Sequence, residues 1–333
     1  MREKVKKSVK FHFVFVLMVL LFMMVGCSPK TLYTLNFETN GGNSIESLNY
    51  DNKTNVVLPA NPQKEGSTFA GWYIDNETFM VDFEPHFLYD TASKDITLYA
   101  RWLDMPEGIN YEIIDNEVTI TSYEGSEKEL VIPYIIDAAP VVTIATRAFD
   151  NNITLESIVL GRFVSSIAAY AFANTSSLKT ITFEEGSKLR TLEDHAFDGA
   201  SSLSRISLPA AVERIGDYAF YQASSLEAIN FDEVAQISSI GDYAFYECVS
   251  LKTIAIPDLV ERIGDYAFFK ASNLKTVSFT QGSFLRYIGV SAFSYAASLE
   301  FIEIPMHVES IEENTFYGAC KLKEVTFLDH GNM

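Results

Sequence analysis

Residues 251–268 read LKTIAIPDLVERIGDYAF, and this stretch decides the fold of the larger part of the chain. Leu251, Ile254 and Ile256 are spaced as in a short strand that buries one face. Pro257 ends the strand because proline has no N–H to donate to a neighbouring strand. The stretch therefore predicts a short strand, a turn and then a segment of different period.

The pattern recurs along the second half of the chain. Its closing phenylalanine returns at alternating spacings of 23 and 25 residues. The positions are Phe149, Phe172, Phe197, Phe220, Phe245, Phe268, Phe293 and Phe316. A leucine column lies six residues after each phenylalanine, from Leu155 to Leu322, and an Ile/Leu column lies five residues before it. Columns in fixed register predict stacked coils, and hence a solenoid.

The segment after each strand changes its period. Ala219 and Ala223 are four residues apart, which suits one helical turn packed on the coil beneath. Asp217, Asp242 and Asp265 precede these segments at the position of an N-cap. The predicted fold class is mainly β with short helical turns.

These repeats resemble the BspA-like leucine-rich repeats, whose signature L-x-x-I-x-I-P-x-x-V-x-x-I-G-x-x-A-F is nearly complete in residues 251–268. The resemblance covers residues 105–333. It implies an N-terminal β cap at 108–133, with residues 117–125 as a hairpin, and eight coils that continue to residue 329. It also implies a leucine-rich-repeat solenoid in a surface protein that adheres to host or neighbouring-cell proteins, with extracellular-matrix ligands in some members.

A smaller module is expected at residues 32–103. It contains YTLNFETNGG, FAGWY and ITLYARW, which are alternating runs separated by turn residues. These landmarks resemble the Listeria/Bacteroides repeat, the internalin B-type repeat, which implies a β-grasp-like spacer or interaction module. Trp72 belongs to that signature and is expected in the core, although a ring that stacks on carbohydrate is an alternative.

The N-terminus has the pattern of an export signal. Basic residues in MREKVKKSVK precede an apolar run from Phe11 to Val25, which is short for a membrane span. Gly26-Cys27 resembles a lipoprotein cleavage site, which implies a signal peptide at 1–26, lipid such as palmitate on Cys27 and a tether at 27–31. The expected location is extracytoplasmic, at the cell surface, lipid-anchored to the bacterial membrane. An uncleaved, unlipidated signal anchor is the alternative.

Charge and motifs exclude several classes of function. The net charge of −19 disfavours nucleic acid as a partner. No metalloprotease, serine-hydrolase or Walker motif occurs, and His195 stands in a column held otherwise by tyrosines, so we predict neither an enzyme nor a cofactor. The column of Asp217, Asp242 and Asp265 could bind calcium or cap turns. Cys248 and Cys320, three coils apart, are predicted not to form a disulfide.

The candidate ligand-binding residues are aromatic. Three successive coils carry ring pairs three residues apart: Tyr218 with Tyr221, Tyr243 with Tyr246, and Tyr266 with Phe269. Exposed tyrosines suit protein recognition. The sequence therefore predicts an adhesin-like lipoprotein that binds an extracellular or host protein through its repeat face. A glycan-binding or purely structural envelope protein is the alternative, and the six rings could instead pack on one another.

Overall fold

The computed structural model describes residues 32–51, 56–77, 94–232, 234–280 and 282–328. It divides the chain into two compact units, one of residues 1–62 and 71–101 and one of residues 63–70 and 102–333. All regular elements among the described residues are strands. Each unit is considered by itself below.

The strands of the first unit belong to a four-stranded sheet, in the order β2-β1-β4-β3. Its strands are β1 (Tyr33–Glu38), β2 (Leu48–Tyr50), β3 (Ser67–Tyr73) and β4 (Ile96–Asp104). β1 pairs parallel with β4 and antiparallel with β2. Leu35 and Leu98 are fully buried. Trp72 is only 5% exposed and packs 5.0 Å from Phe37, so its ring is a core ring with no face open to a sugar.

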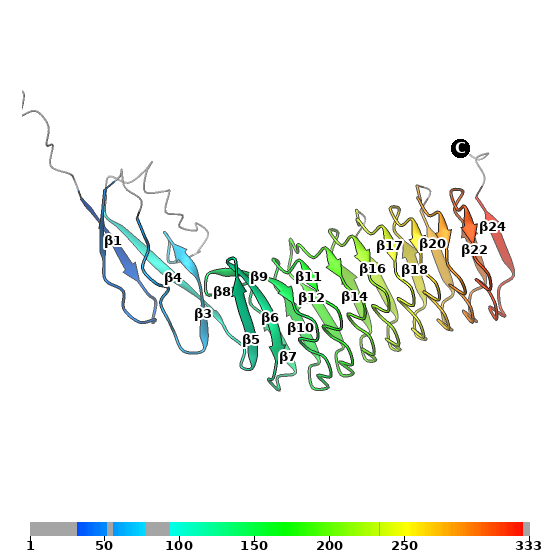
Figure 1. Ribbon diagram of the computed structural model, residues 1–333, viewed down its shortest axis with the longest axis horizontal. Helices are drawn as coiled ribbons and strands as arrows, with labels where there is room; N and C mark the ends of the chain where they lie inside the picture. Colours follow the sequence, from blue (N-terminus) through cyan, green and yellow to red (C-terminus); the bar gives the residue numbers. More distant parts are fainter. Residues whose placement is uncertain (1–31, 52–55, 78–93, 233, 281, 329–333) are drawn as a thin grey trace, which may run out of the picture. The chain divides into compact units, whose positions relative to one another are not determined.

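The second unit is a solenoid in which each coil adds one strand to a parallel nine-stranded sheet (Figure 1). This sheet is called the strand face below. Its strands are β7 (Glu129–Ile132), β10 (Ser157–Leu160), β12 (Thr180–Phe183), β14 (Arg205–Leu208), β16 (Ala228–Phe231), β18 (Thr253–Ile256), β20 (Thr276–Phe279), β22 (Phe301–Ile304) and β24 (Glu324–Phe327). Buried and exposed side chains alternate along β14, β18 and β22, which confirms the predicted short strand.

A second sheet runs along the solenoid. Its two-residue strands are β11 (Ser166–Ile167), β13 (Thr191–Leu192), β15 (Arg214–Ile215), β17 (Ser239–Ile240), β19 (Arg262–Ile263), β21 (Tyr287–Ile288) and β23 (Ser310–Ile311). It continues through β9 (Ala139–Ile144), with which β8 (Ile135–Ile136) pairs, to the antiparallel strands β6 (Glu117–Tyr123) and β5 (Ile109–Ile114). Residues 117–125 are therefore not a hairpin by themselves, because β6 is one strand whose hairpin partner is β5.

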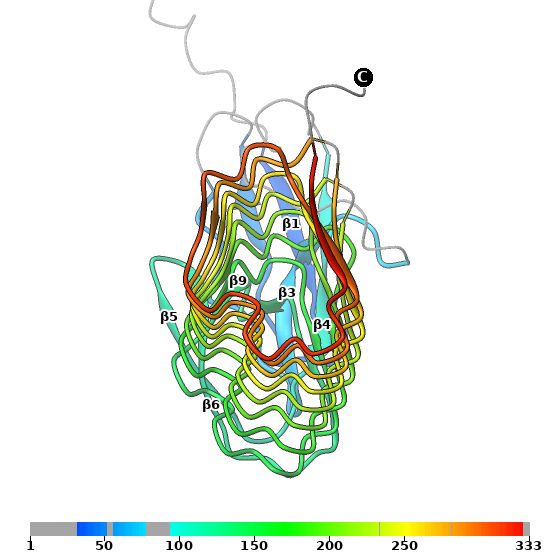
Figure 2. The same cartoon turned by 90° about the vertical axis from the view of Figure 1, so that its right-hand side faces the viewer.

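The core of the solenoid is a column of phenylalanine rings. From Phe149 to Phe316, successive rings stack with centroids 4.9–5.9 Å apart and planes within 11° of parallel. The rings from Phe149 to Phe293 are buried. Viewed along the stack, the coils lie over one another (Figure 2). The predicted columns in fixed register are confirmed.

The predicted helical turns are absent from the described coils. Tyr218 and Gln222 have φ angles of 58° and 54°, whereas a helix requires about −63°. The segment is a run of tight turns in which Tyr221 N–H donates to Tyr218 C=O, while Phe220 N–H donates to Ala244 C=O of the next coil. Alternate amides thus serve the turn and the neighbouring coil. Alanines four apart identify the close packing but cannot distinguish this ladder from a helical turn.

Candidate functional site: an aromatic ladder

The six candidate rings form two adjacent stacked columns, which we call the aromatic ladder. In the first column the ring centroids of Tyr218 and Tyr243 are 4.6 Å apart, and those of Tyr243 and Tyr266 are 4.9 Å apart. In the second column Tyr246 stacks 4.8 Å from Tyr221 and 4.9 Å from Phe269. Rings of the same coil meet at a tilt, 5.6–5.7 Å apart. The structure therefore brings all six residues together.

The ladder is half-buried, and its stacking determines what it presents to solvent. All six side chains have intermediate exposure. Both faces of Tyr243 and of Tyr246 lie against rings of adjacent coils. The accessible parts of these two residues are consequently ring edges and hydroxyl groups. Burial, followed by the charges of Asp242 and Asp217, raises the pKa of Tyr218, so its hydroxyl stays neutral at physiological pH.

The first column is longer than the six residues suggest. His195 is sandwiched between Tyr170 at 4.3 Å and Tyr218 at 4.5 Å, and the Arg147 guanidinium lies 4.5 Å from the Tyr170 ring centroid. The Nδ1 atom of His195 lies 2.9 Å from a carboxylate oxygen of Asp198. Arg147, Tyr170 and His195 have the same offset within the coil as Tyr218, two residues before the core phenylalanine. The column argument applied to Arg147 and Tyr170 could therefore have found them.

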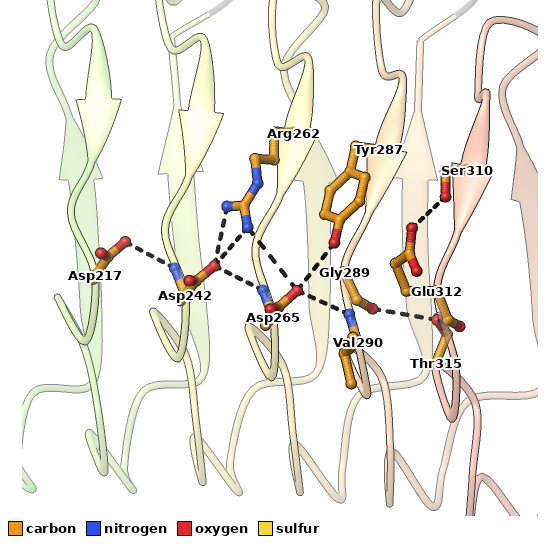
Figure 3. A network of polar contacts seen from close by, with 10 residues as sticks. All are labelled: Asp217, Asp242, Arg262, Asp265, Tyr287, Gly289, Val290, Ser310, Glu312 and Thr315. Atoms are coloured by element: carbon orange, nitrogen blue, oxygen red, sulfur yellow. Dashed lines mark hydrogen bonds and ion pairs between the residues drawn. The ribbon is translucent and has the colours of Figure 1, made fainter.

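A second ladder, of aspartates, consists of the residues that directly precede the first ring column in sequence, Asp217, Asp242 and Asp265 (Figure 3). The Oδ1 atom of Asp217 accepts the backbone N–H of Asp242 at 2.9 Å, and that of Asp242 accepts the N–H of Asp265 at 2.8 Å. The same Asp242 oxygen accepts hydrogen bonds from both terminal nitrogens of Arg262, at 3.0 and 2.9 Å. These aspartates therefore bind the next coil and do not cap a helix.

The aspartate oxygens are used within the fold. Asp265 accepts the N–H of Val290 and, at 3.3 Å, the hydroxyl of Tyr287. Within the part of the chain that the structure describes, no three His, Cys, Asp or Glu side chains are grouped so that they could hold a metal ion. The column of aspartates is thus occupied, through its Oδ1 atoms, by hydrogen bonds to neighbouring coils.

Ion pairs also join neighbouring coils. Glu156 accepts hydrogen bonds from Lys128 at 2.7 Å and Lys179 at 2.5 Å, and these bonds lower its pKa to about 2. Arg286 pairs with Glu309 one coil further along. Because these pairs are exposed, each adds little to the free energy of unfolding. Their pairing of specific residues in adjacent coils is consistent with the coil register.

The cysteines behave as predicted. Cys248 and Cys320 are both free thiols. Cys248 is fully buried in the column of small residues, where its thiol donates to the Phe220 C=O and burial raises its pKa. Cys320 is exposed.

Both parts of the chain match known families of bacterial repeats. Residues 142–239 and 234–332 match the family described as BspA type leucine-rich repeat region. The chain belongs to this family. Residues 33–101 of this BspA-type protein match the Listeria-Bacteroides repeat domain. Both resemblances read from the sequence are confirmed.

Relatives of the repeat protein are bacterial. A leucine-rich repeat protein of T. pallidum is 28% identical with a TM-score of 0.54, and the match covers 59% of this chain and 90% of that one. Two proteins of Evansella cellulosilytica, named "Putative membrane protein" and "Putative Gly-rich membrane protein", are 33% and 41% identical over 33% and 21% of this chain. The chain matches only 15% and 8% of their lengths.

The predicted membrane attachment concerns another part of the BspA-type chain. The predicted signal peptide at 1–26 and the predicted lipid site Cys27 lie outside the described residues. Among those that are described, none forms a helix long and apolar enough to cross a membrane.

Proposed function

We propose that this chain is an adhesin-like surface lipoprotein that binds another protein through its repeat solenoid. The observation that carries the proposal is the aromatic ladder. Stacking on both faces fixes Tyr243 and Tyr246, so their edges and hydroxyls can contact a partner at little further cost in conformational entropy. Tyrosine is enriched at the centres of protein interfaces. Membership of a leucine-rich-repeat family supports the same function.

The anchor proposed for this protein is lipid on Cys27, which would hold it at the outer side of a bacterial membrane. The names of the Evansella relatives agree with a membrane location. Fatty-acid labelling is expected for the intact chain and not for a Cys27→Ser variant. Equal labelling of both would place any lipid elsewhere.

A purely structural role is the second candidate function. Ring centroids 4.3–4.9 Å apart within the columns favour it, because the rings then satisfy one another. The same stacking leaves no open face on Tyr243 for a sugar, so glycan binding has less support here than protein binding.

Replacement of the five ladder tyrosines by phenylalanine separates binding from structure. The positions are Tyr218, Tyr221, Tyr243, Tyr246 and Tyr266. The replacement keeps the stacked rings and removes the hydroxyls. We expect the affinity for a protein captured by the full chain from a host or community extract to fall at least tenfold, since hydroxyl hydrogen bonds at an interface centre are lost. The unfolding midpoint should stay within a few degrees.

The matched control is Tyr317→Phe, which alters a 60% exposed tyrosine of the last described coil that lies outside the ladder. Surface plasmon resonance gives the affinities. An unchanged affinity in the five-fold variant would assign the ladder to the structural role.

A further inference from the structure

The strand face is not uniform, because its strand pairs alternate between complete and interrupted. β10 and β12 pair at four positions, and so do β14 and β16, β18 and β20, and β22 and β24. In contrast, β12 pairs with β14 only at Thr180↔Arg205, β16 pairs with β18 only at Ala228↔Thr253, and β20 pairs with β22 at two positions. The interruptions recur every second coil.

Proline explains the interruptions. At a complete junction Glu184 N–H donates to the Leu160 C=O of the preceding coil at 3.1 Å. At the next junction Pro209 follows β14 at the corresponding position and has no N–H to donate to Phe183. Pro257 and Pro305 follow β18 and β22 in the same way. Where glycine replaces proline, at Gly161 after β10, the junction with β7 is complete at four positions.

The interrupted junctions expose apolar surface. Ile181, Ile229 and Val277, in β12, β16 and β20, are buried but 6%, 5% and 4% exposed. In the strands that end at the prolines the values are lower, at 1% for Ile206, 2% for Ile254 and 1% for Ile302. The last residues of β12, β16 and β20, Phe183, Phe231 and Phe279, are only partly buried. Their counterparts Leu160, Leu208, Ile256 and Ile304 are buried. The strands thus separate toward their C-terminal ends.

A cleft of about 500 Å³ lies at the first interrupted junction. Phe183 and Ile181 provide apolar lining, and Thr182 and Ser207 provide hydroxyls. Glu184, which follows β12, and Asp232, which follows β16, add two carboxylates. One oxygen of each accepts a backbone N–H, from Arg162 and from Val234, both at 3.0 Å. Arg205 also lines the cleft, but at the paired end of the junction. The widened end therefore combines apolar surface with hydrogen-bond acceptors and negative charge.

We propose that this cleft, together with the equivalent interrupted junctions of β16 with β18 and of β20 with β22, binds the lysine or arginine side chains of an extended, basic segment of a partner protein. Such a side chain has an aliphatic stem, which would pack on Phe183 and Ile181, and a cationic head, which would meet Glu184 and Asp232. The Phe183 carbonyl, which Pro209 cannot serve, is a further acceptor. The net charge of −19 favours the approach of a basic segment.

The interrupted junctions recur every second strand, and this distance sets the spacing expected of the basic residues. Two parallel strands span about 9.6 Å across a sheet. Three residues of a polyproline II helix span about 9.3 Å and return the side chain to the same side. A partner segment that lies along the solenoid with a basic residue at every third position would therefore place successive basic side chains at successive interrupted junctions. This inference rests on the proposed protein-binding function and assigns it a second surface.

Two labelled peptides of identical composition test the inference with the full chain. One repeats Lys-Pro-Pro five times, and the other places its five lysines together between two runs of five prolines. Fluorescence polarisation should show at least tenfold tighter binding of the spaced peptide. The triple variant Pro209→Ala, Pro257→Ala and Pro305→Ala restores three N–H donors, so it should complete the interrupted junctions and remove the preference. Pro133→Ala is the matched control, because Pro133 follows β7, the edge strand of the sheet.

A second variant changes side-chain charge and leaves the backbone hydrogen-bond donors unaltered. Glu184→Gln with Asp232→Asn keeps the size of both side chains and should weaken the spaced peptide at least fivefold, with unchanged circular dichroism. Equal affinity for the two peptides, or a preference that survives both sets of replacements, would overturn the inference. Loss of binding in the Tyr→Phe ladder variant would also contradict it. If a captured partner protein binds the chain but neither peptide does, the strand-face inference fails while protein binding through the solenoid stands.

Discussion

Gly264→Ala is expected to lower the free energy of unfolding by about 2.5–6 kcal/mol. A Cβ atom at this position would lie 2.5 Å from the Oδ1 atom of Asp242 and 2.5 Å from the Asp242 nitrogen. Overpacking costs about 1–3 kcal/mol. Displacement of the carboxylate would add the loss of its bond from Asp265 N–H, about 1.5–3 kcal/mol for a charged acceptor. Urea unfolding followed by circular dichroism measures the effect.

Gly282→Ala is the matched control for this substitution. The nearest atom to its added Cβ would be Asp258 Oδ2 at 3.5 Å, an ordinary contact. We expect a change within about 1 kcal/mol, because alanine also restricts the unfolded chain. Equal effects at the two glycines would show that the aspartate ladder does not press against Gly264.

Phe245→Ala should destabilise the solenoid by about 3–5 kcal/mol. The ring is fully buried and stacks 5.2 Å from Phe220 and 5.1 Å from Phe268, so its removal leaves a cavity between two coils. Coils interact only with their neighbours, and a break in the middle would uncouple the coils on either side. Urea unfolding should then show a less cooperative transition.

Phe284→Ala makes the same chemical change at a ring that is 49% exposed. It should cost less than about 1 kcal/mol, as surface substitutions usually do. If it proved as destabilising as Phe245→Ala, the phenylalanine column would not be the core of the fold.

The sequence predicted the stack because its burial pattern repeats in register. The prediction places Phe220, Leu226 and their equivalents in the core, where the structure has them. It also places the proline after Ile256 directly behind a strand, as observed. The prediction of helical turns is wrong, because alanines at Ala219 and Ala223 fit both a helical turn and a run of tight turns. The distinguishing property is the positive φ of Tyr218, and tyrosine is an uncommon residue there.

The candidate site was predictable in composition and less so in geometry. Constant offsets placed Tyr218, Tyr243 and Tyr266 together, but face-to-face stacking depends on the coil spacing and on the backbone that directs the rings. The interrupted junctions had a sequence signal as well. The alternation of 23 and 25 residues coincides with Pro209, Pro257 and Pro305, yet only the strand register shows that each proline interrupts a junction.

The most direct test of the locked coil register is a designed disulfide on the strand face. Thr253 of β18 and Thr276 of β20 are exposed register partners, about 4.8 Å apart across the sheet. With Cys248→Ala and Cys320→Ser in the background, Thr253→Cys and Thr276→Cys should form a disulfide under mild oxidation, because the spacing suits the bond. Thr253→Cys with Phe301→Cys, two strands apart, should stay reduced. No bond in the first pair, or equal bonding in both, would contradict the stacked solenoid.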